Sequence, residues 1–311
     1  MKITTRMIFI TIKKTKMETV NSLSGGKTSS YMAVHYPADY NIFAVVCIDD
    51  PKCAPKDKQI VQAINDKLGA EKIKTYGEFI ASAEDDKTLK VIFDLEQKLG
   101  KEIIWTRGDS FDAINKKSNA IPNYVRRFCT TGMKLDPIFY WWQDNFNEQT
   151  VSMNLGYRID EIERGYMYDE SIKKFVPKHE KPYHAIVGKS KNGRNKWADV
   201  YWRETNYPLI TNQVNHRMVR EWAETTALDF PSDSNCVGCF WKNVQQLRKN
   251  WDDNPEKMQW FADQEKKIKS KSGKPRRWKT EATYEQIKTI GLQQDFFFGT
   301  GSGCQAGFCT D

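Results

Sequence analysis

The stretch from Val20 to Pro37, VNSLSGGKTSSYMAVHYP, constrains the fold more than any other part of the sequence. A short segment that reads as a buried strand ends at Ser24, two adjacent glycines follow, and a helix-like segment begins at Lys27. Pro37 ends that segment, because proline cannot continue the helical hydrogen-bond ladder. A Walker phosphate loop needs four residues between its first glycine and its Gly-Lys pair, so this loop is too short to be one. The stretch predicts a tight turn from a first strand into a first helix.

Strand-like and helix-like segments alternate over the following residues. Further strands are expected at Ile42–Ile48, Lys72–Tyr76, Glu102–Thr106 and Val151–Tyr157. Helices are expected from Asp57 to a stop at Gly69, and from Leu89 to a stop at Gly100. This alternation predicts an α/β fold, with a Rossmann-like, mostly parallel five-stranded sheet and helices on both faces. Ligands of such sheets bind beyond the carboxyl ends of the strands.

The pattern changes near residue 165 and divides the chain into three segments. Residues 1–16 are expected to be a leader or an extra strand, and residues 17–165 to form the α/β domain. Residues 166–311 are expected to form a basic loop and a helical, cysteine-containing extension that packs on the same core. The apolar run Met7–Ile12 is short for a signal peptide, and no run approaches the ~20 residues of a membrane helix. We therefore expect no membrane association.

Seven cysteines are present: Cys47, Cys53, Cys129, Cys236, Cys239, Cys304 and Cys309. An odd number without a signal peptide indicates a reducing compartment, so a cytoplasmic protein is expected. Cys236 and Cys239 form a C-x-x-C pair, and Cys304 and Cys309 form a second close group. Thiolates from such separated segments suit an iron–sulfur cluster as well as a structural zinc ion, and free thiols are the third alternative.

Basic residues are unevenly distributed along this chain of net charge +8. The segment Lys266–Lys279 carries eight basic and no acidic residues, and Lys173–Lys196 is also mostly basic. Such runs are typical of solvated loops, and they are also typical of contacts with nucleic acid or another polyanion. A nucleic acid is therefore kept as a candidate partner. The sequence leaves homo-oligomers open.

Consecutive backbone N–H groups from Gly25 to Ser29 are expected to lie at a helix N-terminus. Such a site attracts phosphate or sulfate through its unpaired N–H groups and the helix dipole, and glycines let the ligand approach the backbone. Ser24, Thr28 and Ser29 add hydroxyl groups, and Lys27 adds a positive charge. Gly156–Arg158 falls at another predicted strand end. These two strand ends predict one anion site.

Four stretches, taken together, resemble one known family. SGGKTSS resembles the loop of adenine nucleotide α-hydrolase-like (PP-loop) proteins, within them most closely the phosphoadenosine phosphosulfate (PAPS) reductase family. RRFCTTGMKLDPI (Arg126–Ile138) and LGYRIDEIERG (Leu155–Gly165) are similar to two further segments of that family. NCVGCFWKN (Asn235–Asn243) is similar to a segment of its phage and mobile-element branch. The four occur in the family's order and span about residues 20 to 265.

The resemblance implies that residues 17–165 are a nucleotide-binding PP-loop domain that holds ATP, PAPS or adenosine phosphosulfate (APS). It implies nucleotide or phosphate contacts from Ser24, Gly25, Gly26, Lys27, Thr28, Ser29, Lys134, Arg158 and Arg164. Catalytic roles are expected for Lys27, Arg158 and Cys309. Relatives with a [4Fe–4S] cluster suggest Cys129, Cys236 and Cys239 as ligands with Cys309 as the fourth, and zinc as the alternative. Surface ion pairs with Asp160, Glu161 or Glu163 are another explanation for the two arginines.

Two departures from the family pattern bear on the reaction. Asp49 and Asp50 stand where relatives usually carry Asn-Thr-Gly, and two carboxylates near an anion favour Mg²⁺ with ATP unless they point away. The C-terminal Glu-Cys-Gly-Leu-His segment of PAPS reductases is missing. The tail GSGCQAGFCTD offers Cys304 and Cys309 instead, as thiolate nucleophiles or as metal ligands.

The expected function is therefore an enzyme that performs sulfur chemistry on an adenine nucleotide. In one version it is an oxidoreductase that reduces a PAPS- or APS-type sulfonucleotide to sulfite. In the other it is an ATP-dependent sulfurtransferase that adenylates an acceptor, releases pyrophosphate and then transfers sulfur supplied by a donor protein. The alternative class is a non-catalytic nucleotide-binding protein, or a structural zinc protein, in a defence or nucleic-acid-modification complex.

Overall fold

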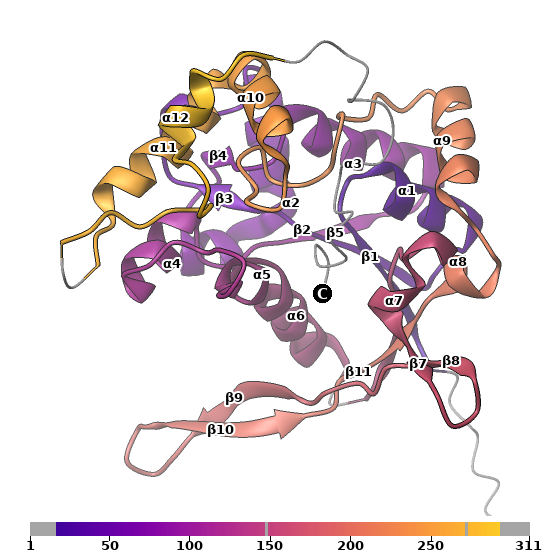
Figure 1. The fold of residues 1–311 in the computed structure, drawn as a ribbon. Coiled ribbons are helices and arrows are strands. Elements are labelled where there is room, and N and C mark those ends of the chain that lie inside the picture. The colour runs from indigo at the N-terminus through magenta and orange to yellow at the C-terminus, as the bar shows by residue number, and fades with distance from the viewer. Residues whose placement is uncertain (1–16, 147–148, 271–272, 293–311) are drawn as a thin grey trace, which may run out of the picture.

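The computed structural model describes residues 17–146, 149–270 and 273–292 (Figure 1). The expected leader, residues 1–16, lies outside the described residues, as do Cys304 and Cys309. Among the described residues, no helix has the length and apolar character needed to cross a membrane.

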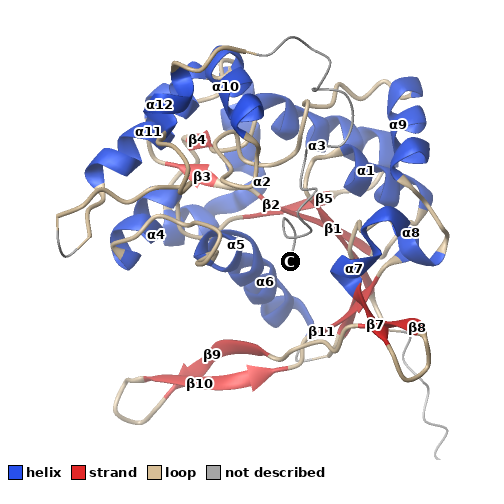
Figure 2. Ribbon diagram, in the orientation of Figure 1, coloured by secondary structure: helices blue, strands red, loops and turns tan. Residues whose placement is uncertain are grey.

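A five-stranded parallel sheet forms the centre of the molecule (Figure 2). Its strand order is β11-β6-β1-β2-β5. The strands are β1 (Thr19–Leu23), β2 (Tyr40–Ala44), β5 (Ile103–Thr106), β6 (Val151–Asn154) and β11 (Arg203–Asn206). Helices cover both faces, which confirms the expected Rossmann-like α/β class.

The prediction of a strand at Lys72–Tyr76 is wrong, because these residues continue helix α2 (Lys58–Tyr76). None of them is buried, whereas a strand inside a parallel sheet is buried on both faces. The fifth strand is instead β11, which lies in the segment expected to be a basic loop. Gly69, the expected stop of the helix, adopts φ 71° and interrupts α2 without ending it.

The expected strand Ile42–Ile48 is divided in two. β2 ends at Ala44, and β3 (Cys47–Ile48) pairs with β4 (Ala81–Ser82) as a separate antiparallel pair. The chain leaves the main sheet at Val46, where the backbone N–H donates to the Glu84 carboxylate at 3.3 Å. The run is nevertheless buried throughout, as its apolar composition indicates.

A row of asparagines crosses four neighbouring strands and fixes their register. Asn206, Asn154, Asn21 and Asn41 are aligned across β11, β6, β1 and β2. Their side-chain amides donate to one another at 2.8, 2.8 and 3.1 Å. A buried amide is costly without a partner, so a one-residue shift of any of these strands would break the row.

The helices pack in two layers around the sheet, and a third group follows in sequence (Figure 1). α2 and α3 (Asp86–Leu99) share an apolar cluster with Phe43 and Trp105, while α6 (Asp136–Phe146) packs with Ile42 and Ala44 on the opposite face. The remaining helices are α1 (Lys27–His35), α4 (Phe111–Ser118), α5 (Phe128–Thr130), α7 (Ile162–Gly165), α8 (Pro208–Thr211), α9 (His216–Thr225), α10 (Val244–Asp253), α11 (Pro255–Lys267) and α12 (Tyr284–Lys288).

The C-terminal helices α10, α11 and α12 pack together at one end of the molecule (Figure 1). Their buried side chains, among them Trp251, Phe261 and Tyr284, form one cluster with Phe111 and Met133 of the preceding α/β region. Trp278, which is 1% exposed, belongs to the same cluster. This cluster brings the segment with Cys236 and Cys239 against the segment with Cys129.

Two β-hairpins occupy the segment that the sequence indicated as a basic loop. β7 (Tyr166–Asp169) pairs with β8 (Lys174–Pro177), and β9 (Tyr183–Lys189) pairs with β10 (Asn195–Val200). The β9–β10 hairpin extends away from the body of the molecule (Figure 1). At its base the Tyr183 hydroxyl donates a hydrogen bond to the Asp136 carboxylate of α6, and the Tyr183 ring packs 4.8 Å from Phe139.

The Asp136 contact leads to a prediction about stability and pH. Burial, opposed by Lys117, raises the pKa of Asp136 from 3.8 to about 6. The folded state therefore favours the protonated acid, and this contribution to stability is present below pH ~3.8 and is lost as pH rises through ~6. Asp136→Asn, which still accepts from Tyr183, should raise the free energy of unfolding by about 1–2 kcal/mol at pH 8.

Urea unfolding at pH 4 and pH 8 checks this prediction, because the gain should be small at the lower pH. The matched control is Asp144→Asn at an exposed position of the same helix, which should change little at either pH. A gain that does not depend on pH would show that the ionisation of Asp136 is not the cause.

Candidate functional site

The turn between β1 and α1 requires both of its glycines. Gly25 has φ 71°, a left-handed conformation that glycine adopts without strain, and a Cβ there would lie 2.5 Å from Thr88 Cγ2. A Cβ on Gly26 would collide with the side chain of Ser234. The second glycine therefore lets the segment before Cys236 approach the turn.

The first turn of α1 presents backbone N–H groups. Gly26 is the N-cap and provides no side-chain cap, and the first N–H groups of any α-helix have no partner within the helix. The Ser29 hydroxyl donates to the Gly26 carbonyl at 3.1 Å and accepts from the Ser24 N–H at 3.2 Å, which holds the turn closed. This geometry suits a phosphate or sulfate oxygen.

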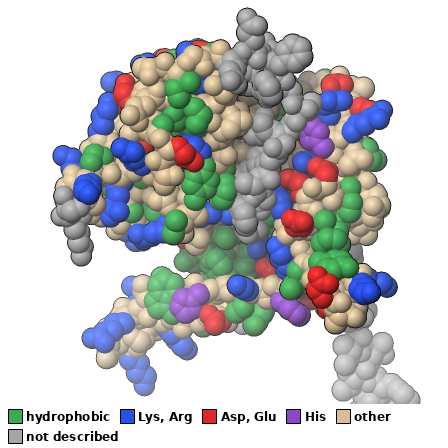
Figure 3. Space-filling view, in the orientation of Figure 1, with side chains coloured by type: hydrophobic (Ala, Val, Ile, Leu, Met, Phe, Trp, Pro, Cys, Tyr) green, Lys and Arg blue, Asp and Glu red, His purple; other side chains and the backbone are tan. Residues whose placement is uncertain are grey.

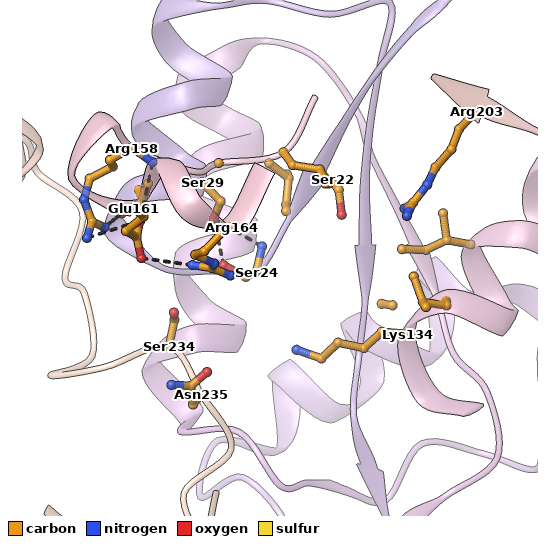
Figure 4. Close-up of a pocket in the computed structure, with 17 residues that line it drawn as sticks. Ser22, Ser24, Ser29, Lys134, Arg158, Glu161, Arg164, Arg203, Ser234 and Asn235 are labelled. Atoms are coloured by element: carbon orange, nitrogen blue, oxygen red, sulfur yellow. Dashed lines mark hydrogen bonds and ion pairs between the residues drawn. The ribbon is translucent and has the colours of Figure 1, made fainter. Parts of the chain in front are cut away.

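A cavity, here called the loop cavity, opens beyond the carboxyl ends of β1 and β6 (Figure 4). Its polar lining residues are Ser22, Ser24, Thr28, Ser29, Lys134, Arg158, Glu161, Arg164, Arg203, Ser234 and Asn235. Figure 4 shows Arg158, Glu161 and Arg164 on one side, with Lys134 and Arg203 on the other. Four cationic side chains against one carboxylate make the cavity suitable for an anion.

Arg158 and Arg164 line this cavity and also form the ion pairs that offered the other explanation for them. Arg158 contacts Asp160 at 3.1 Å and Glu161 at 3.2 Å, and Arg164 contacts Glu161 at 2.9 Å. Arg158 also donates to the Thr28 hydroxyl at 2.9 Å, which ties the end of β6 to the first turn of α1. Glu161 therefore holds both guanidinium groups beside the loop.

Lys134 enters the loop cavity from the π-helical turn Thr131–Leu135, and its Nζ lies 3.9 Å from Glu84 Oε1. Glu84 is fully buried, and burial raises the pKa of its carboxyl group. Burial lowers the pKa of Lys134, but Glu84 and the neighbouring thiols raise it, and the net shift is upward. Lys134 therefore remains a positive charge in this wall of the cavity.

Cys129, Cys236 and Cys239 line a second, adjoining cavity, here called the cysteine pocket. Lys134 and Asn235 line both cavities. Burial raises the pKa of all three thiols, that of Cys129 to about 11, and the nearby Cys239 adds to the shift at Cys129. Neighbouring buried thiols ionise far more readily when a metal cation replaces their protons, so the donor chemistry fits a metal-containing group.

Within the described parts of the chain, no group of three or more His, Cys, Asp or Glu side chains is arranged to hold a single metal ion. Cys309, expected as the fourth ligand and as a nucleophile, lies outside the described residues, as does Cys304. Cys47 and Cys53 are buried elsewhere, and burial raises the pKa of each thiol to about 12.

Some residues that the sequence indicated do not line the loop cavity. Lys27 is exposed at the start of α1, and Gly25 and Gly26 shape the turn behind the lining residues. Asp49 accepts a hydrogen bond from Ser110 at 2.5 Å, and Asp50 caps the short helix Pro51–Cys53. The two carboxylates therefore point away from the anion site. This is the alternative to the expectation that they hold Mg²⁺ beside ATP.

Other lining residues were not selected from the sequence. Arg203 comes from β11 and Ser234 from the segment before Cys236, and neither belongs to a recognisable pattern. Asn235 lies inside a quoted motif without having been assigned a role, and Glu161 was expected only as a possible ion-pair partner of the arginines. Ser234 has one indirect signal, because adjacent glycines in the loop indicate that another segment approaches the backbone.

The chain was also compared with known proteins. Comparisons with protein-family models, with curated proteins and with solved structures found no match. The PAPS reductase resemblance therefore depends on the four motifs alone. Residues from all four motifs line the two cavities, although the motifs lie far apart in the sequence.

Proposed function

We propose that this chain is a nucleotide-binding enzyme of the PAPS reductase type that performs sulfur chemistry on an adenine nucleotide. The observation that carries the proposal is the shared wall of the two cavities, in which Lys134 and Asn235 face both the anion site and the three thiols. An anionic group held by the loop is thereby next to sulfur ligands, as a reaction at a sulfate or phosphate end requires.

The residues of the loop cavity would bind the anionic end of the nucleotide. The N–H groups of the first turn of α1 and the hydroxyls of Ser24 and Thr28 would donate to its oxygens, while Arg158 and Arg164 would balance its charge. Lys134 would stabilise negative charge that develops toward the cysteine pocket. Apolar side chains, among them Leu155 and Ile138, line the rest of the cavity.

Cys129, Cys236 and Cys239 would hold an iron–sulfur cluster or a zinc ion, together with a fourth ligand such as Cys309. A cluster would supply charge stabilisation or electrons next to the anion, and zinc would be structural. Anaerobic purification followed by iron, sulfide and zinc analysis separates the two. Cys236→Ser should lower the content of whichever metal is present.

Asp49 and Asp50 bond elsewhere instead of facing the anion, which removes the argument that they made for Mg²⁺ with ATP and leaves both versions of the reaction to be tested. Incubation with labelled PAPS, APS and ATP, with a thiol reductant present, tests this. Release of sulfite supports the reductase version. Release of pyrophosphate from ATP supports the sulfurtransferase version. A protein that binds all three nucleotides and releases neither product would be a binding module.

Arg164 gives the sharpest test of the anion site. Its side chain is 8% exposed, and a charge-assisted hydrogen bond contributes about 1.5–3 kcal/mol. Arg164→Gln should therefore weaken nucleotide binding by about 10- to 100-fold in a calorimetric titration. The matched control is Arg217→Gln, because Arg217 also pairs with a glutamate close to it in sequence but is 79% exposed and outside the cavity. Equal affinities of the two variants would place the nucleotide elsewhere.

A further inference from the structure

The β9–β10 hairpin is anchored at its base and free along the rest of its length. Ala185 is buried against the cluster of α6, and Tyr183 and Val200 pack on the same cluster. By contrast, every residue from Val187 to Trp197 is exposed. The turn is well formed, because the Ser190 N–H donates to the Arg194 carbonyl at 2.8 Å. The hairpin is therefore an arm that is packed at its base and exposed along its outer part.

The outer part of the arm is basic. It carries Lys189, Lys191, Arg194 and Lys196, and no acidic residue lies between Val187 and Trp197. None of these four side chains forms a salt bridge with the described residues of the protein. Figure 3 shows Lys and Arg side chains gathered at the far end of the arm. Four like charges on an exposed ribbon are suited to a polyanion.

One face of the arm carries an aromatic platform. Trp197 is 54% exposed, and its ring stacks on His184 of the neighbouring strand at 5.2 Å with an interplanar angle of 9°. His184 is held in place by Asp199, at 2.8 Å from its Nδ1. The platform lies beside the basic end of the arm, since Lys196 directly precedes Trp197. A flat ring next to several cations is the combination that binds single-stranded nucleic acid.

The base of the arm is connected to the loop cavity. Glu180, just before β9, contacts Arg203 at 3.0 Å and accepts from the Thr205 hydroxyl at 2.7 Å, and both partners belong to β11. Arg203 itself lines the loop cavity (Figure 4). The arm therefore begins at the wall of the cavity, and a ligand bound along it would extend from there.

We propose that the β9–β10 hairpin binds a single strand of nucleic acid, with its basic end on the phosphates and Trp197 stacked on a base. The inference does not depend on the sulfur chemistry proposed above, since it concerns binding to the arm alone. An anionic membrane surface would also attract the charges, so binding to lipid vesicles is measured as a competing outcome of the test.

The test uses the full chain and fluorescein-labelled single-stranded RNA and DNA of mixed sequence, titrated between ~0.05 and ~0.2 M salt. In one variant Lys189, Lys191, Arg194 and Lys196 are all changed to Gln. It should bind on the order of 100-fold more weakly at ~0.1 M salt. Each neutralised phosphate of a single strand contributes about 0.7 to the slope of log K against log salt, so the loss of four charges should make this slope shallower by about 3. Trp197→Ala should cost about tenfold, and Trp197→Phe should retain most of the affinity.

The matched control neutralises the other basic run at four exposed positions, Lys267, Lys269, Lys274 and Arg277. Each variant loses three lysines and one arginine, so the two variants have the same net charge. Equal losses of affinity in the two variants would overturn the proposal, because net charge alone would then explain binding. Tighter binding to a duplex, or to phosphatidylserine vesicles, than to single strands would also overturn it. Thermal unfolding should be unchanged in both variants, since all eight side chains are exposed.

Discussion

Replacing Lys134 by methionine is expected to lower turnover by about 10²–10³-fold and to lower the free energy of unfolding by about 2–3 kcal/mol. The stability loss follows from Glu84, which is fully buried and has Lys134 Nζ 3.9 Å from its Oε1. That oxygen has no hydrogen-bond partner among the described residues, whereas Oε2 accepts from the Val46 N–H and the Ser82 hydroxyl. Without Lys134, a buried carboxylate must lose its counter-charge or take up a proton.

The activity loss has a different cause, since Lys134 lies in the wall between the loop cavity and the cysteine pocket. A cation at this place would stabilise charge that moves between the bound anion and the thiols, and removal of such a group costs about 10²–10³-fold in turnover. The two effects can be separated in a second variant. Lys134→Met combined with Glu84→Gln replaces the buried pair by neutral groups and should recover most of the stability.

Urea unfolding and steady-state kinetics on the single and double variants measure these effects. The double variant should unfold close to the wild type and keep the turnover loss of the single lysine variant. If it regained activity with its stability, Lys134 would act only by holding the fold, and the role assigned to it in the shared wall would be wrong. Glu84→Gln alone leaves Lys134 in place. Its turnover should therefore fall less than that of either variant without Lys134.

The sequence predicted those parts of the structure that are encoded by apolar patterning. Thr19–Leu23, Ile103–Thr106 and Val151–Asn154 are strands of the central sheet in which most side chains are buried, as expected of strands inside a parallel sheet. The loop followed from its glycines, one of which has a positive φ. The convergence of the cysteines and arginines followed from the motifs of the resemblance, not from periodicity.

The structure differs from the prediction where local sequence carries little signal. β11 is an edge strand of sequence RETN, half-exposed and charged, as edge strands that avoid aggregation are. Its position is fixed by contacts with distant residues, through the Asn206–Asn154 hydrogen bond and the Arg203–Glu180 ion pair. The members of these pairs are 52 and 23 residues apart, so no short stretch of sequence contains both. The prediction of a strand at Lys72–Tyr76 was wrong because this short segment, although its composition resembles a strand, lies within the longer helix α2.

Gly108→Ala is expected to destabilise the protein by about 3 kcal/mol or more, although the added group is only a methyl. A Cβ on Gly108 would lie well inside 3.0 Å of the Gly132 carbonyl oxygen and 3.4 Å from the Met133 Cα. Both are backbone atoms, so no side-chain rotation can relieve the clash. The turn Thr131–Leu135 would have to move, and Lys134 would move with it.

The matched control is Gly291→Ala, where a Cβ would meet no atom within 4 Å and the change should stay within about 0.5 kcal/mol. Urea unfolding of both variants gives the stability difference, and nucleotide affinity of Gly108→Ala below its unfolding transition gives the effect on the site. Because the loop after β5 holds the turn that carries Lys134, affinity should fall in the fraction that remains folded. Full affinity in that fraction would mean that the close contact between Gly108 and Gly132 supports the fold without positioning Lys134.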